Sequence, residues 1–371
     1  MGFFDHFLRD VRQILFRDEE QNAIPSMDGA LSPNDRLDQC SAVGDPLPGL
    51  DDVAPAPDGS IYVSAGKSVL RLSGAGFASR AIVAEFDSEA GGLALHPDGS
   101  LLVCVTGHGL AAVAPNGANR WLRTAGGRML VGPTAVTAAP DGTIYIAEGS
   151  IDRRPEEWLR DLMEKRANGR LLRASPSLES AEVLLENLAY PNGVMVGTEG
   201  SLLYSESWSH AVSRASRDGT HLGAPSAIAR NLVGYPARLR PSSDGSFWLP
   251  CFGVRTHLTE FVLREDEFRE EMLRTVSQQY WLGPALSSGH DCLEPMQIGS
   301  VKALGIQKPW APPRSYGLLV RMHASGEIIE SLHSRADGKY HGITAACDTP
   351  QGLVIASKGA GRLLLRAGER Q

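Results

Sequence analysis

A short turn motif recurs along this chain between pairs of apolar runs. The motif is Asp-Gly or a close variant, and each copy precedes a strand-like run such as Ser60-Ile61-Tyr62-Val63. Asp-Gly between apolar runs is a strong hairpin signal, because both residues tolerate a positive φ in a tight turn. The first three copies are 40 and 43 residues apart, which is typical of the blades of a radial repeat. The copies are Asp58-Gly59, Asp98-Gly99, Asp141-Gly142, Glu199-Gly200, Asp244-Gly245 and Gln351-Gly352.

A second apolar run follows each hairpin and confirms the period. Most of these runs contain an Arg, as in Val69-Leu70-Arg71-Leu72 and Leu318-Leu319-Val320-Arg321. Each unit therefore reads as an inner strand, a turn, a second strand, a third strand and a fourth strand. The sequence predicts an all-β fold, a six-bladed β-propeller, in which ring closure leaves only short sheet edges. A β-sandwich with many hairpins is the alternative, which the matched pairs of runs disfavour.

The length of 371 residues fits one propeller with two insertions and an N-terminal extension. We expect an N-terminal helix and lead-in over residues 1–45 and the propeller over 46–371. The insertions cover 151–168 and 256–314, and each begins with a pattern that favours a helix. Because long insertions in a rigid scaffold are commonly binding loops, the second one is predicted to be a lid over one mouth of the tunnel. An oligomer contact or a cover for a blade edge is the alternative.

The N-terminal segment is amphipathic rather than a secretory signal. Apolar side chains such as Phe3, Phe7 and Val11 recur at helical spacing between charges, and no small-residue cleavage site follows. The segment favours either a helix docked on the propeller or a peripheral membrane contact. The absence of a signal and of a long apolar stretch predicts a cytoplasmic protein, with membrane-peripheral attachment as the alternative.

Charge and cysteine content exclude several classes of site. The net charge is −7 and no Lys/Arg-rich tract is present, so no nucleic-acid partner is expected. The five cysteines are widely spaced and form no CxxC pair, which argues against a zinc site of the usual spacing. Cys104 and Cys347 stand in apolar runs and are predicted to be buried free thiols, in keeping with a reducing compartment.

Several motifs resemble those of the strictosidine synthase-like proteins. They include Tyr190-Pro191-Asn192-Gly193-Val194, the run Tyr204-Ser205-Glu206, and Gly234-Tyr235-Pro236. The resemblance covers roughly residues 24–368 and is most specific in the middle third of the chain. The wider superfamily includes gluconolactonase- and regucalcin-like proteins and paraoxonases, which are six-bladed propellers. The resemblance implies the same fold and a small-molecule active site in the central tunnel.

The resemblance also implies a divalent cation, usually calcium, that several inner strands hold in the tunnel. The ligands would be an acid from the first blade, Asn from the third and fourth, and Asp from the fifth. Here these positions fall on Asp51 (or Asp52), Thr134, Asn192 and Ala237, with Arg238 adjacent. A calcium site gathers 6–8 oxygens including carboxylates, so this set predicts no metal cofactor. A weak site for calcium or another divalent cation on Asp51 and Asn192 is the alternative.

Polar residues near the ends of the inner strands are the candidates for chemistry. A neutral imidazole such as that of His341 can be a general base near neutral pH, and an Arg fork can bind a carboxylate or steady an oxyanion. Capping of blade backbone is the alternative role for the two Glu residues, and structural or solvated roles for the His and Arg residues. The expected catalytic residues are Asp51, Asn192 and His341, and the expected substrate contacts are Thr134, Glu148, Glu206, Arg238, Arg255 and His257.

Three functions remain open at this point. The first is a hydrolase of small molecules of the lactone or ester type, and the second is a propeller that binds a small molecule without catalysis. The third is the amine–aldehyde condensation of strictosidine synthase, which needs a glutamate near the last blade. The matching stretch, Tyr340 to Cys347, contains no Glu, which disfavours the condensation.

Overall fold

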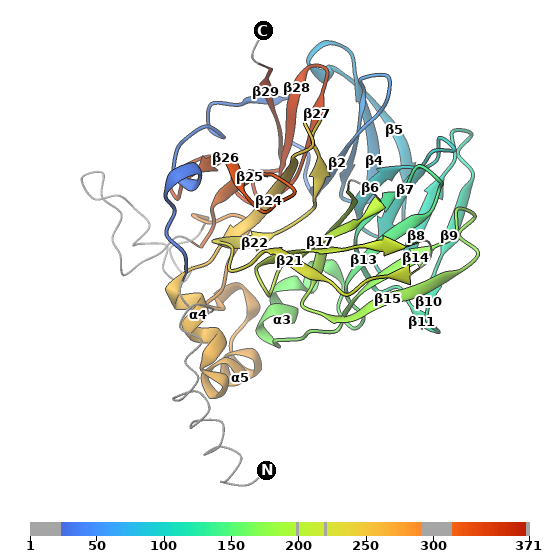
Figure 1. The fold of residues 1–371 in the computed structure, drawn as a ribbon. Helices are drawn as coiled ribbons and strands as arrows, with labels where there is room; N and C mark the ends of the chain where they lie inside the picture. The colour runs from blue at the N-terminus through green and yellow to red at the C-terminus, as the bar shows by residue number, and fades with distance from the viewer. Residues whose placement is uncertain (1–23, 198–199, 219–220, 291–313, 369–371) are drawn as a thin grey trace.

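The computed structural model describes residues 24–197, 200–218, 221–290 and 314–368. Six sheets of at least four antiparallel strands follow one another along the chain, which confirms the six-bladed β-propeller (Figure 1). The amphipathic segment predicted at the N-terminus and Cys292 lie outside these residues. In the described residues, no helix has both the length and the apolar character needed to cross a membrane.

The first three blades are continuous in sequence. Their strands are β2 Leu50–Pro55, β3 Ile61–Ala65, β4 Ser68–Ser73 and β5 Ser79–Glu85; β6 Ala90–Leu95, β7 Leu101–Val105, β8 Gly109–Val113 and β9 Asn119–Leu122; and β12 Gly132–Ala138, β13 Ile144–Ser150, β14 Gly169–Ala174 and β15 Ala181–Leu188. A small hairpin between the second and third blades consists of β10 Thr124–Ala125 and β11 Arg128–Met129.

The last three blades carry the longer insertion and the ring closure. Their strands are β16 Pro191–Val196, β17 Leu202–Glu206, β18 Ala211–Ala215 and β21 Ser226–Ala229; β22 Gly234–Pro236, β23 Arg240–Pro241, β24 Phe247–Val254, β25 Gly317–Met322 and β26 Ile328–Ser334; and β27 Ile343–Thr349, β28 Gly352–Ser357, β29 Arg362–Ala367 and β1 Ser41–Val43. A second small hairpin consists of β19 Arg217–Asp218 and β20 His221–Leu222.

The ring is closed by a strand from the other end of the chain. Strand β1 pairs antiparallel with β29, with Ser41 opposite Leu365 and Val43 opposite Leu363. The last blade therefore takes its outer strand from the N-terminal side, which leaves no open gap between the first and last blades. Pairing at Ser41 also places the start of the propeller a few residues before the predicted boundary at residue 46.

Apolar clusters fill the interfaces between neighbouring blades. Successive residues of one strand pack against different neighbouring blades. On β13, Ile144 and Ile146 pack toward the second blade. Tyr145 and Ala147 pack toward the fourth blade. Side chains alternate between the two faces of a strand, so both faces of each blade are buried. This explains why the blade strands read as nearly continuous apolar runs in the sequence.

The Asp-Gly turns form by a mechanism that differs from the predicted one. Only the glycine has a positive φ, as in Gly99 and Gly245 (84° each), whereas the preceding aspartate does not. The aspartate instead accepts a hydrogen bond from the backbone two residues later: Asp98 Oδ1 accepts from Ser100 N at 2.8 Å. The second carboxylate oxygen pairs with an arginine. In the fifth blade, for example, Asp244 Oδ2 accepts a hydrogen bond from Arg321 Nη2 of β25 at 2.5 Å. The recurrent arginine thus ties the turn to a neighbouring strand of the same blade.

Both predicted insertions contain helices, and these helices pack together. The first insertion holds a 3-10 turn, Pro155–Glu157, and α3, Trp158–Met163; the second holds α4, His257–Arg264, and α5, Asp266–Thr275. Leu162 and Met163 of α3 share an apolar cluster with Val262 of α4 and Met272 of α5. Figure 1 shows the three helices at the same end of the propeller. Further 3-10 turns in the described residues include Gly29–Leu31, Ala75–Phe77 and Gln278–Tyr280.

Candidate functional site

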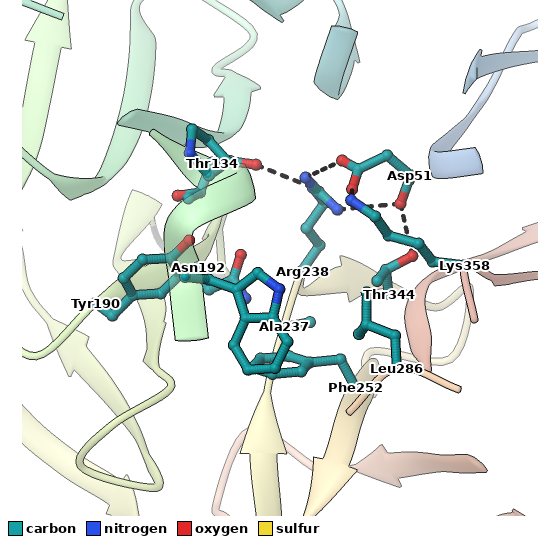
Figure 2. A pocket seen from close by; sticks show the side chains of 12 residues that line it. Asp51, Thr134, Tyr190, Asn192, Ala237, Arg238, Phe252, Leu286, Thr344 and Lys358 are labelled. Atoms are coloured by element: carbon teal, nitrogen blue, oxygen red, sulfur yellow. Dashed lines mark hydrogen bonds and ion pairs between the residues drawn. The ribbon is translucent and has the colours of Figure 1, made fainter. Parts of the chain in front are cut away.

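A pocket opens at the mouth of the central tunnel, on the side of the helical insertions. It consists of two adjoining hollows with cavity volumes of about 50 and about 280 Å³. Inner strands of several blades and the two insertions line it (Figure 2). The lining residues of the smaller hollow are Asp51, Thr134, Pro155, Trp158, Tyr190, Asn192, Ala237, Arg238, Phe252, Leu286, Thr344 and Lys358.

Glycines let the inner strands approach one another at the axis. A Cβ on Gly92 of β6 would lie 2.7 Å from the carbonyl oxygen of Thr134 on β12, and one on Gly193 of β16 would lie 2.4 Å from that of Ala237. Real Cβ atoms do not come this close to backbone, so any other residue would force neighbouring inner strands apart. These glycines therefore set the narrow spacing that brings side chains from different blades into one pocket.

Three charged side chains from distant parts of the chain meet in this pocket. The Arg238 guanidinium contacts the Asp51 carboxylate through Nη2, and its Nε donates to the carbonyl oxygen of Thr134 at 3.0 Å. Lys358 Nζ donates to Asp51 Oδ1 at 2.5 Å. Figure 2 shows Asp51 held between Arg238 and Lys358. Each oxygen of the Asp51 carboxylate thus has a cationic partner.

The two cations decide the ionisation of Asp51. Burial alone would raise the pKa of this carboxyl group, but Arg238 and Lys358 outweigh it and hold the pKa below its usual range. Asp51 is therefore a carboxylate at neutral pH. Its backbone carbonyl is engaged as well, since it accepts hydrogen bonds from Arg238 Nη1 at 3.1 Å and from the Thr344 hydroxyl at 2.7 Å.

A second aspartate, Asp52, lies next to Asp51 in the sequence and also faces buried cations. Asp52 is fully buried and its Oδ2 accepts from Arg240 Nη2 and from Leu93 N, both at 2.7 Å. The same oxygen lies 3.6 Å from Arg238 Nε. A register shift in the pairing of β2 with β3 falls between Leu50 and Asp52. This irregularity lets both consecutive aspartates face buried cations, although neighbours on a regular strand point to opposite faces.

Asn192 and Tyr190 come from the start of the fourth inner strand. Asn192 Nδ2 donates to Ser207 Oγ at 3.2 Å, and that hydroxyl donates to the carbonyl oxygen of Pro236 at 2.7 Å. Tyr190 has φ +59°, which is strained for a bulky residue and is typical of functional sites. Its ring packs against that of Trp208, with the centroids 4.4 Å apart and the planes tilted by 30°. The strained turn thus presents both the aromatic ring and the amide to the pocket.

The insertions supply an apolar wall on the outer side of the pocket. Trp158 of α3 meets Phe252 of β24 edge to face, with ring centroids 5.3 Å apart. Leu286 of the second insertion lines both hollows. Charged groups therefore lie on the axial side of the pocket and aromatic or aliphatic groups on the side of the insertions, an arrangement suited to a small, partly apolar ligand with a polar group.

Two predicted substrate contacts turn away from the pocket. Glu148 lies on β13, a second strand, and its Oε2 accepts from Arg170 at 2.5 Å in a fully buried pair. Burial raises the pKa of Glu148, although Arg170 opposes that effect. Glu206, at the end of β17, accepts from Ala189 N at 2.8 Å. Both side chains fix backbone beside the pocket, and neither lines it.

Three further candidates lie at the base of the second insertion. Arg255 Nε donates to Glu260 Oε1 at 2.9 Å, and His257 is exposed at the start of α4. His341 Nε2 donates to the carbonyl oxygen of Arg335 at 2.7 Å, so its Nδ1 accepts from Ser315 Oγ at 2.8 Å. The Ser315 hydroxyl also contacts Ser288 Oγ at 2.5 Å, across the stem of the insertion. The structure thus gives His341 an anchoring position rather than a place in the pocket.

The residues present do not fit the calcium site that the fold suggests. Both Asp51 oxygens already face cations, Thr134 donates its hydroxyl to the carbonyl of Pro191 at 2.7 Å, and Ala237 has no oxygen-bearing side chain. Within the part of the chain that the structure describes, no group of three or more His, Cys, Asp or Glu side chains could hold a metal ion. No chemical step is therefore assigned to a metal here.

The sequence is similar to a family model and to several known proteins. The sequence model described as strictosidine synthase matches residues 134–218. Adipocyte plasma membrane-associated protein of Salmo salar is 26% identical over 341 residues, covering 87% of this chain and 75% of the relative. Strictosidine synthase-like 6 of Arabidopsis thaliana is 29% identical over 161 residues, covering 43% of each. The chain is therefore similar to strictosidine synthase-like proteins.

Solved structures similar to this chain show the same fold at low identity. A gluconolactonase from Xanthomonas campestris has a TM-score of 0.58 at 14% identity, with 88% of this chain and 89% of that chain covered. A calcium-binding regucalcin from Agrobacterium tumefaciens has a TM-score of 0.56 at 11% identity, with 88% and 93% covered. The resemblance predicted from the sequence is confirmed.

Proposed function

We propose that this strictosidine synthase-like propeller is a small-molecule hydrolase that cleaves a lactone or ester in the axial pocket. The observation that carries the proposal is the convergence of Asp51, Arg238 and Lys358 beside a wall of aromatic side chains. The larger hollow, about 280 Å³, is of a size for a small ligand. Further support comes from the fold neighbours that are described as gluconolactonases.

In the proposed reaction, water attacks the carbonyl carbon and Asp51 accepts the proton of that water. The bond from the carbonyl carbon to the alcohol oxygen breaks, and the leaving oxygen takes the proton, so an acid and an alcohol are released. Negative charge develops on the carbonyl oxygen in the transition state, where fixed positive charge stabilises it most. Arg238 and Lys358 both line the pocket, and their positive charges would stabilise the developing oxyanion.

Lys358 is the mobile partner in this scheme. Its side chain is 35% exposed, whereas Asp51 and Arg238 are 12% and 8% exposed. An arriving substrate can draw the ammonium group from Asp51 Oδ1 toward the carbonyl oxygen, which frees that carboxylate oxygen for water. Arg238 would stay in place because its guanidinium also holds the backbone of Thr134 and Asp51.

A binding propeller without catalysis is the second candidate. Both Asp51 oxygens have cationic partners, and the lowered pKa of Asp51 makes it a weak base. If substrate does not displace Lys358, the pocket can bind a ligand but has no group free to activate water. Condensation of the strictosidine synthase type is not proposed, because Tyr340 to Cys347 lacks the required carboxylate.

A panel of lactones and aryl esters distinguishes the two candidates. Each compound is tested for hydrolysis, with and without a chelator, and for its effect on the melting temperature of the protein. A hydrolase turns over at least one compound at a rate that the chelator does not change. Compounds that raise the melting temperature without being cleaved would favour binding alone, and neither effect with any compound would argue against both candidates.

A further inference from the structure

The guanidinium group of Arg238 lies in a nest of oxygen atoms. Its Nε donates to the carbonyl oxygen of Thr134 at 3.0 Å, its Nη1 donates to the carbonyl oxygen of Asp51 at 3.1 Å, and its Nη2 contacts the Asp51 carboxylate. The carboxylate of Asp52 lies 3.6 Å from Nε. Arg238 as a whole residue is 7% exposed, so these protein oxygens, rather than water, provide most of its surroundings.

These oxygens are the kind of ligand set that hard cations prefer. Calcium takes carboxylate and backbone carbonyl oxygens, and the nest around Arg238 offers two carboxylates and two carbonyls from the first and third blades. The carboxylates need a positive charge, because an unpaired buried carboxylate is strongly destabilising. An arginine side chain meets that need permanently, since it stays protonated in proteins and is covalently attached.

We infer that Arg238 is the resident cation of the propeller axis, and that its removal would convert the same oxygens into a divalent-metal site. The inference concerns what occupies the axis, and it holds whether the pocket hydrolyses its ligand or only binds it. Arg240 and Lys358 neutralise part of the same acidic pair, through Asp52 and Asp51 respectively. Neither of them reaches both aspartates, whereas Arg238 lies within 4 Å of both.

The unaltered protein provides the first test. Elemental analysis after purification in calcium-containing buffer is expected to find no stoichiometric metal, and terbium(III) is expected to give no saturable luminescence. Calcium and chelator should both leave the melting temperature unchanged. One tightly held metal ion per chain, with a chelator-sensitive melting temperature, would overturn the inference.

The Arg238→Ala variant provides the second test. Removal of the guanidinium leaves Asp51 and Asp52 short of one cation, so the variant should melt at a lower temperature. Calcium or guanidinium ions should restore part of that loss in a saturable way, and terbium should bind at one equivalent. A variant that neither ion stabilises, or that binds no terbium, would overturn the inference even if the wild-type protein is free of metal.

A matched control shows whether the effect belongs to the axis. Arg321→Ala also removes an arginine from a carboxylate, but Asp244 is half-exposed and lies at a turn rather than in an oxygen nest. This control should gain no response to calcium or terbium. Arg238→Lys keeps the positive charge and should also gain no terbium site, which separates loss of the cation from loss of packing. Terbium binding by either control would contradict the inference.

Discussion

Arg238 and Asp51 form an ion pair at the propeller axis although 187 residues separate them in the chain. The contact links the first blade to the fifth, so it forms only when the ring is assembled. Lys358, from the last blade, adds a second cation to the same carboxylate. The pocket is therefore a property of the whole ring, and substitutions that alter this charge cluster should change function more than substitutions on the outer strands.

Lys358→Met tests the mobile cation of the proposed site. We expect the kcat/KM for ester or lactone hydrolysis to fall on the order of 10²-fold, because one positive charge near the developing oxyanion is lost. The free energy of unfolding should change by less than about 1 kcal/mol, since the lysine is partly exposed. Lys339→Met is the matched control, because Lys339 is exposed and outside the pocket. Equal activities of the two variants would argue against a role for Lys358.

Tyr190→Ala tests the strained aromatic residue of the pocket wall. Loss of the buried ring and of its contact with Trp208 should lower the free energy of unfolding by about 3 kcal/mol, as for other buried aromatic truncations. Ligand affinity should fall as well, because the ring lines the pocket. Tyr190→Phe keeps the ring and should retain most of both properties. Denaturant unfolding and ligand titration measure the two effects. Equal stability and affinity of the Ala and Phe variants would contradict the role of the ring.

Gly245→Ala tests the role of glycine in the Asp-Gly turns. Gly245 has φ +84°, and a Cβ there would meet no atom within 4 Å, so the cost is backbone strain alone. We expect a loss of about 1 kcal/mol in the free energy of unfolding. Gly368→Ala is the control, since that glycine is equally open but lacks a positive φ. Equal stability of the two variants in urea would show that the turn does not depend on the left-handed conformation.

Two buried histidines should make the fold sensitive to acid. Burial lowers the pKa of His210 and of His333 from 6.5 to about 4. A folded-state pKa below the unfolded value means that the unfolded chain binds more protons between these two pH values, so stability falls as pH drops from 6.5 toward 4. Each histidine can contribute up to about 3 kcal/mol of this loss. Unfolding measured across this range should show it.

A variant pair checks that assignment. His333 is fully buried, with Nδ1 at 3.0 Å from the Tyr316 hydroxyl, so His333→Gln should reduce the slope of stability against pH. His257→Gln changes an exposed histidine and should leave the slope as it is. An unchanged slope in the His333 variant would assign the acid sensitivity to other groups.

The fold could be predicted from the sequence because its signals are local and repeated. Each Asp-Gly turn is a short-range feature, and the apolar runs such as Leu101–Val105 reflect strands buried on both faces. The predicted mechanism of the turns was wrong in one detail. The aspartate contributes through its carboxylate, not through a positive φ. Both mechanisms give the same residue pattern, so the sequence does not distinguish them.

The site was predicted only in part, for a geometric reason. Asp51, Thr134, Asn192 and Arg238 come from the inner strands or directly follow one, and all four line the pocket. Glu148 lies on a second strand, one position farther from the axis, where it pairs with Arg170. The order of the strands from the axis was inferred correctly. The prediction did not take into account that side chains of the second strand form contacts within and between blades rather than at the axis.

Other pocket residues could not be predicted, because they do not belong to any motif that the sequence shows. Lys358 follows the second strand of the last blade and reaches Asp51 only because the ring closes. Trp158 and Leu286 belong to insertions, and their positions depend on how these insertions pack on the propeller. The predicted lid gave a reason to expect contacts from residues 256–314, but it did not identify the residue that makes them.

Hydrolysis by Asp51→Asn is compared with hydrolysis by the wild-type protein, on the lactone or ester that is cleaved fastest, to test whether Asp51 activates water in the axial pocket. Asparagine keeps the shape of the side chain but removes the charge that accepts the proton from water. We expect kcat/KM to fall by about 10²-fold or more in a variant that still folds. An unchanged kcat/KM would contradict this expectation and place the chemistry outside the axial pocket.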